Sequence, residues 1–180
     1  TQAACEREER VISHRTILSG LPDAKSATPD TAPITSKFVE NSKSVADDRL
    51  IIEEPNGRVR LIAKNPRHLM IHIYGTLDAN NDDLFVDQVL SARSKGEYAQ
   101  AGRDPRESFN ALKARRDDLE QLFSRMPMGE GTPGVRFDNL GANTFRLRLP
   151  ASVAQDLNWI GIDMVLEQGN WRLRWFVPAE

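Results

Sequence analysis

The sequence predicts an α+β protein in which a β-hairpin and three helices precede a run of antiparallel strands. Three observations predict this class. β-Branched residues flank an Asn-Gly turn near residue 56, apolar residues recur at helical spacing between residues 66 and 126, and apolar and polar residues alternate after residue 134. Strands and helices do not alternate along the sequence, and it holds no glycine-rich phosphate loop, which excludes a doubly wound nucleotide-binding sheet.

The first elements are a hairpin and a helix. Runs 50–54 and 58–62 surround Asn56 and Gly57, residues that tolerate the positive φ angles of a tight turn, so we expect a β-hairpin. Asn65 can cap a following helix, because its side chain can accept a hydrogen bond from a free N–H of the first turn. Pro66 suits the first helical position, because the N–H that proline lacks would have no partner there. The helix ends near Ala79 and buries one face: Leu69, Met70, Ile73, Tyr74 and Leu77.

Two more helices are predicted before the strands. The first covers residues 82–91 and directs Phe85, Val86, Val89 and Leu90 inward. The second begins with Asp104 as cap, Pro105 at the first position and Glu107 at the reciprocal position of a capping box. It runs without a break to Met126 and stops at Pro127.

The last third of the chain has the period of β-strands. Residues 135–138 and 144–149 are the first two strands, and residues 159–167 and 171–177 form a closing hairpin around residues 168–170. Strict alternation places one set of side chains on the dry face of this hairpin: Ile160, Ile162, Met164 and Leu166 opposite Trp171, Leu173 and Trp175.

The chain divides into residues 1–49, a tether or linker, and residues 50–180, a folded domain that includes the hairpin. Residues 19–33 are rich in Pro, Ser, Thr and Asp and carry little apolar surface, which favours an extended linker, although a loop packed on the domain is the alternative. Small residues before the lone Cys5 resemble the end of a bacterial lipoprotein signal. Cys5 is therefore a candidate lipidation site, and an unmodified thiol is the alternative.

Composition excludes several functions. The 24 basic and 26 acidic side chains give a net charge of -2, which argues against nonspecific nucleic-acid binding. One cysteine and three histidines do not form a recognisable zinc motif, so we expect no metal and no cofactor. No apolar run in the sequence is long enough to cross a bilayer, which leaves lipidation as the expected means of membrane attachment.

Two stretches resemble the nuclear-transport-factor-like, or SnoaL-like, superfamily of cystatin-like cone domains. Residues 69–85 resemble its opening helices, with an apolar helix, a small acidic corner and the start of a second helix, and residues 163–176 resemble its final Trp-containing hairpin. The resemblance covers about Pro66 to Val177. It implies a curved antiparallel sheet wrapped around N-terminal helices to form a cone with a pocket, used by different members for isomerases, dehydratases, ligand binding or protein contacts.

Candidate site residues follow from this cone. The pocket candidates are His72, Tyr74, Trp159, Trp171 and Trp175, and for each aromatic residue core packing is the alternative role. On the other sheet face, beside Asp163, alternation gathers a basic stripe that an acidic partner or an anionic ligand could contact, or that cross-strand ion pairs could neutralise: Arg146, Arg148, Arg172 and Arg174. The stripe also allows a homodimer.

The sequence therefore favours a noncatalytic domain of a bacterial envelope or periplasmic protein that binds a small apolar ligand or another protein; a cytoplasmic location is the alternative. The alternative activity is a small-molecule isomerase or dehydratase, in which His72 moves protons and Tyr74 donates a hydrogen bond in the pocket. Residues two apart on a helix point about 200° away from each other, which disfavours that pairing.

Overall fold

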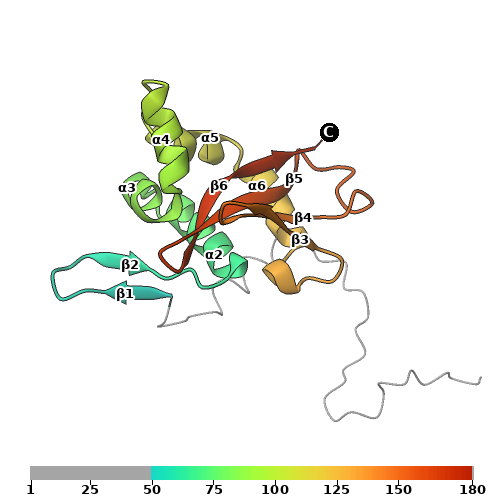
Figure 1. Cartoon of the computed structure of the whole chain (residues 1–180), viewed down its shortest axis with the longest axis horizontal. Coiled ribbons are helices and arrows are strands. Elements are labelled where there is room, and N and C mark those ends of the chain that lie inside the picture. Colours follow the sequence, from blue (N-terminus) through green and yellow to red (C-terminus); the bar gives the residue numbers. More distant parts are fainter. Residues whose placement is uncertain (1–49, 180) are drawn as a thin grey trace, which may run out of the picture. The chain divides into compact units, whose positions relative to one another are not determined.

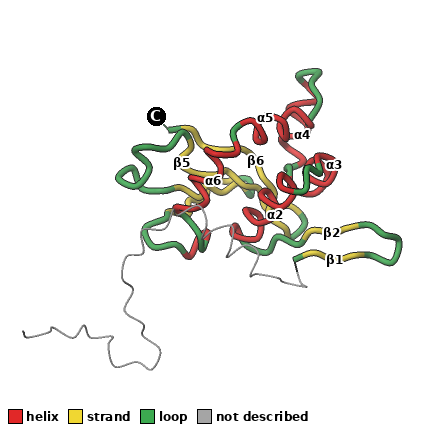
Figure 2. Tube along the Cα trace, turned by 180° about the vertical axis from the view of Figure 1, so that it is seen from behind, coloured by secondary structure: helices red, strands yellow, loops and turns green. Residues whose placement is uncertain are grey.

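The computed structural model describes residues 50–179, which belong to a compact unit spanning Pro33–Glu180. The α+β class is confirmed. A two-stranded hairpin precedes the helices, and a four-stranded antiparallel sheet of order β3-β4-β5-β6 follows them. Helices α2 (Pro66–Asp78) and α6 (Arg116–Arg125) lie behind the sheet in Figure 1 and in front of it in Figure 2, so they cover one of its faces. Cys5 and the predicted tether lie outside the described residues.

The first hairpin pairs β1 (Ile51–Glu53) with β2 (Val59–Leu61), as predicted. Its turn closes when the Gly57 N–H donates to the Glu54 carbonyl at 2.9 Å. Within this turn Gly57 takes a positive φ, of 78°, and Asn56 does not. Asn56 instead accepts a hydrogen bond from the Arg58 N–H at 2.9 Å, which fastens the turn from the side.

Helix α2 begins and packs as predicted. The Asn65 side chain accepts a hydrogen bond from the His68 N–H at 2.8 Å, with Pro66 at the first helical position. All five residues of the expected apolar face are buried. The second predicted helix also forms, but in two parts, because α3 (Asp82–Leu84) passes into the π-helix η1 (Phe85–Val89). Phe85, Val89 and Leu90 are buried.

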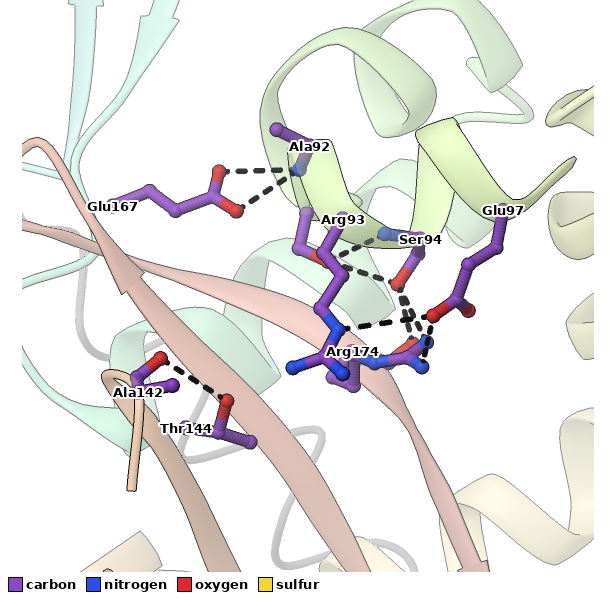
Figure 3. Close-up of polar contacts among 9 residues, drawn as sticks. Ala92, Arg93, Ser94, Glu97, Ala142, Thr144, Glu167 and Arg174 are labelled. Carbon is purple, nitrogen blue, oxygen red and sulfur yellow. Dashed lines mark hydrogen bonds and ion pairs between the residues drawn. The ribbon is translucent and has the colours of Figure 1, made fainter. Parts of the chain in front are cut away.

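Helix α4 (Ala92–Gln100) is absent from the sequence prediction. It has few apolar residues, and contacts with distant parts of the chain hold it. The Ser91 N–H donates to the Leu173 carbonyl at 2.8 Å, and the Ser94 hydroxyl donates to the Arg174 carbonyl at 2.8 Å. Arg174 in turn donates to Glu97 at 2.6 Å (Figure 3). These bonds cover the outer edge of β6 (Asn170–Pro178), which would otherwise expose unpaired backbone groups.

The long predicted helix is wrong in its continuity. It forms α5 (Arg106–Ala114) and α6, separated at Arg115, whose φ of -117° and ψ of 32° lie outside the helical region. Only half of the predicted capping box before α5 forms. The Glu107 carboxylate accepts from the Asp104 N–H at 3.3 Å, but the Asp104 side chain accepts from the Arg106 N–H at 2.9 Å and not from Glu107. The break carries the Arg115 guanidinium to 4.4 Å from the centre of the Trp159 ring. Apolar residues keep helical spacing across the break, so the periodicity does not reveal it.

The four-stranded sheet joins β3 (Arg136–Gly141), β4 (Thr144–Arg148), β5 (Trp159–Glu167) and β6. Strict alternation fails in its last hairpin. Asp163 pairs with Trp175 and Met164 with Leu173, which leaves Arg174 as an extra residue in β6. Because one extra residue reverses the sides of all that follow, Phe176 rather than Trp175 joins Leu173 in the core. Leu166, expected to be inward, is 36% exposed.

The core between helices and sheet is closely filled. Several of its largest side chains are fully buried, and they come from every layer of the fold: Met70, Ile73, Phe85, Leu112, Phe123, Leu147 and Ile162. Between residues 50 and 179, no helix combines the length and the apolar composition that crossing a bilayer requires.

Candidate functional site

An apolar groove of about 210 Å³ lies between the β1–β2 hairpin and helix α2. The hairpin contributes Ile51, Val59 and Leu61, of which Ile51 is 51% exposed at the mouth. The remaining lining comes from α2, the residue after it and α3: Ile71, His72, Gly75, Thr76, Ala79 and Leu84. The groove is therefore an aliphatic surface with a single titratable side chain.

Gly75 keeps this groove open. It sits in the middle of α2, is exposed, and has no neighbouring atom within 4 Å of the position that a Cβ would occupy. Glycine in a helix interior costs about 1 kcal/mol relative to alanine. Since no neighbouring atom excludes a larger side chain here, the space left by Gly75 is itself a feature of the groove.

His72 forms part of the groove wall and is only 4% exposed. Its Nε2 lies 3.0 Å from the Ile62 carbonyl oxygen, so Nε2 carries the proton and donates it. Burial lowers the pKa of His72, the bond to Ile62 opposes that change, and the positive charges of His68 and Arg172 lower the pKa further. The imidazole is therefore neutral at pH 7 and serves to hold the chain after β2.

Gln88 on η1 fixes the hairpin above the groove. Its amide donates to the Val59 carbonyl at 2.6 Å and accepts from the Leu61 N–H at 2.8 Å. The Gln88 side chain thus provides hydrogen-bond partners for backbone groups of β2, as a neighbouring strand would. Gln88 is not predictable from the sequence, because no local pattern marks a residue that pairs with a strand 27 positions away.

Tyr74 lies apart from the groove, in a polar cluster with helix α6. Arg116 donates to the Tyr74 hydroxyl at 2.8 Å, and that hydroxyl donates to Glu120 at 3.3 Å. Burial raises the pKa of Tyr74, and the hydrogen bond from Arg116 opposes the change. Arg116 also bonds Glu120 and Asp78, which raises its own pKa. His72 and Tyr74 therefore meet different neighbours.

The three tryptophans are also separated. Trp159 stacks on Phe176 with ring centres 4.4 Å apart. Trp171 packs edge-on against Phe145 at 5.0 Å, near the other end of the hairpin. Trp171 pairs with Leu166, which lies seven residues after Trp159 on β5. At the rise of a strand, this separation is about 23 Å. Trp175 pairs with Asp163 and is a partly buried side chain that packs against the core without belonging to it. These residues do not line one pocket with His72.

The four arginines of the predicted stripe differ in their partners. Arg146 binds both Asp163 oxygens, at 2.7 and 2.8 Å, and these bonds raise its pKa. Arg148 lies 3.2 Å from Asp138, and Arg174 binds Glu97. Arg172 forms no ion pair or hydrogen bond through its side chain with any described residue. Three of the four positive charges are thus neutralised locally, and Arg172 alone is left over.

Within residues 50–179, no group of three or more His, Cys, Asp or Glu side chains is arranged to hold a metal ion. Comparison of the chain with protein-family models, with curated proteins and with solved structures gives no match.

Proposed function

We propose that this chain is a noncatalytic binding domain that takes a small aliphatic ligand in the groove between the β1–β2 hairpin and α2. The observation that carries the proposal is the open space at Gly75, in the middle of a wall of aliphatic side chains. Burial of aliphatic carbon in such a groove is favourable by about 0.8 kcal/mol for each methylene group.

The size of the groove limits the ligand. Pockets for drug-sized molecules occupy about 300–1,000 Å³, whereas this groove measures about 210 Å³. A short alkyl chain matches the space, and a polycyclic ligand exceeds it. The single titratable wall residue, His72, already donates to a backbone carbonyl, so the ligand's contacts are apolar.

A titration with straight-chain primary alcohols, from ethanol to decanol, tests the proposal. We expect affinity to rise about fourfold per carbon and then level off once the chain fills the groove. In ¹H–¹⁵N NMR spectra, the shifts should concentrate at Ile71, Gly75 and Ala79. Shifts that spread over the whole surface, or an affinity that never levels off with chain length, would contradict a defined groove.

The alternative activity, an isomerase or dehydratase, receives less support from the site. It requires His72 and Tyr74 to act in one pocket, and their hydrogen-bond partners lie on different elements, Ile62 and helix α6. General acid–base catalysis also needs a group whose proton is free to move near its reactant. We therefore propose binding and not catalysis.

We also propose that α2 to β6 form a cone domain of the SnoaL-like superfamily. Support comes from the element order, in which helices precede an antiparallel sheet that ends in a Trp-containing hairpin, and from the helices on one sheet face. An experimental structure with a measured sheet curvature tests this proposal, since a flat sheet would contradict the cone.

Placement in the bacterial cell envelope remains a prediction from the residues around Cys5. The intact mass of natively expressed protein tests it directly. We expect diacylglyceryl and acyl groups on Cys5 as the first residue. An unmodified cysteine that still follows Ala4 would contradict lipidation.

A further inference from the structure

A second groove, of about 530 Å³, opens where the β5–β6 turn meets the start of helix α4. Its wall differs in chemistry from the aliphatic groove, because charged and amide side chains predominate. The lining comes from η1, α4 and the last hairpin: Asp87, Leu90, Ala92, Lys95, Glu167, Gln168 and Arg172.

Arg172 is the unusual member of this wall. Its guanidinium is half-buried, and loss of water lowers its pKa, whereas the charges of Glu167 and Asp87 act in the opposite direction. Neither carboxylate comes within ion-pair distance of Arg172. A guanidinium carries five donors in a planar fork that matches a carboxylate. None of the Arg172 side-chain nitrogens is fully buried, so a ligand that enters the groove can reach this fork. Among the described residues, no side chain pairs with the Arg172 fork.

The other charges of the groove divide into engaged and unengaged groups. Both Glu167 oxygens accept from the Ala92 N–H at the start of α4, at 3.0 and 3.2 Å (Figure 3). Lys95 donates to the Asp87 carbonyl oxygen at 3.2 Å. The Asp87 carboxylate forms no hydrogen bond or ion pair with any described residue and is exposed. One unengaged cation, Arg172, and one unengaged anion, Asp87, therefore face the same groove.

The β5–β6 turn, beside Arg172 and Asp87, contributes the side-chain amide of Gln168 to the rim of the groove. Gln168 has a φ of 49°, a left-handed conformation that residues other than glycine seldom adopt. Gly169 follows with a φ of 74°, which completes a tight hairpin turn. This backbone places the Gln168 side chain in the groove wall, where it adds a neutral donor and acceptor.

We propose that this groove binds a small zwitterion of the α-amino acid class. The ligand carboxylate pairs with the fork of Arg172, and the ligand ammonium pairs with Asp87. A short aliphatic side chain of the ligand lies against Leu90 and Ala92. The site is separate from the alkyl groove at Gly75 and does not depend on it.

Calorimetric titration of the full chain with L-valine tests the proposal. Valinamide lacks the carboxylate and N-acetylvaline lacks the ammonium, so each analogue should bind at least tenfold more weakly than valine. Arg172→Gln should lower the affinity for valine at least tenfold and leave the affinity for valinamide unchanged. Asp87→Asn should lower the affinity for valine and leave the affinity for N-acetylvaline unchanged. This crossed pattern assigns each charge of the ligand to one residue.

Arg136→Gln is the matched control, because Arg136 on β3 is exposed and its side chain forms no hydrogen bond or ion pair with a described residue. It should bind valine as the unmodified chain does. Unchanged thermal unfolding of Arg172→Gln would show that its loss of binding is local.

Three results would overturn the proposal: no heat of binding with valine at millimolar concentration, equal binding of acetate and valine, or a valine affinity that Arg172→Gln does not alter. Alkanol binding at the Gly75 groove is measured separately, so either proposal can fail alone.

Discussion

At the scale of single residues, two glycines inside regular elements, Gly75 in helix α2 and Gly161 in strand β5, have opposite roles. Gly75 has open space around its missing side chain, whereas a Cβ on Gly161 would lie 2.3 Å from the Leu147 carbonyl oxygen. Both are isolated glycines within regular elements, and sequence alone does not separate them. The distinction depends on which strand or hairpin lies opposite.

Alanine at these two positions should therefore shift stability in opposite directions. We expect Gly75→Ala to raise the free energy of unfolding by about 0.5–1 kcal/mol, since helix propensity improves without a clash. Gly161→Ala should lower it by about 1–3 kcal/mol or more, because β4 must move away from β5. Urea denaturation measures both. A destabilised Gly75→Ala would show that the groove is narrower than the structure describes.

His72 should make stability depend on pH in a known direction. Because burial lowers its folded-state pKa below 6.5, the unfolded chain binds more protons in the range between the two values. The stability contributed by neutral His72 is thus complete above pH 6.5 and decreases as the pH falls toward the folded-state pKa. The free energy of unfolding is measured from pH 5 to 8. His72→Gln should flatten the slope of this free energy against pH, and His68→Gln should retain most of the slope. An unchanged slope in His72→Gln would contradict the assignment.

At the scale of elements, local rules predict those that form through their own residues. The Asn65 cap, the apolar face of α2 and the Gly57 turn are all short-range features, and all are present. Local rules fail where a distant partner decides. Helix α4 depends on β6, the break at Arg115 brings that residue to Trp159, and the bulge at Arg174 accompanies its bond to Glu97. The candidate site follows the same division: His72 was predicted, but Gln88 and the open side of Gly75 depend on packing of the hairpin.

The hairpin above the groove should loosen without Gln88. Gln88→Ala removes both bonds to β2 and leaves the Leu61 N–H and the Val59 carbonyl without protein partners, at a cost of about 1–3 kcal/mol. Hydrogen exchange should show faster exchange at the Leu61 amide, with α5 and α6 unaffected. Gln121→Ala is the control, since Gln121 is exposed on α6. Equal protection of Leu61 in both variants would mean that the hairpin is held by other contacts.

At the scale of the whole molecule, residues 50–179 share one hydrophobic core. The fully buried side chains run from Leu69 in α2 to Leu173 in β6, and they belong to the compact unit Pro33–Glu180. We therefore expect residues 33–180 to unfold in one cooperative step, with the same midpoint as the full chain. Chemical denaturation followed by tryptophan fluorescence measures this, because all three tryptophans lie between positions 159 and 175. A lowered midpoint would show that the first 32 residues stabilise the domain.

The groove kept open by Gly75 is proposed to bind aliphatic ligands, and hexanol binding to two leucine variants tests this claim. Gly75→Leu places a side chain in the groove without a backbone clash, and Gly96→Leu makes the same change in α4, where the Cβ position is equally free. We predict that hexanol affinity falls at least tenfold in Gly75→Leu and stays unchanged in Gly96→Leu, with both variants folded. Equal hexanol affinity in the two variants would contradict the claim.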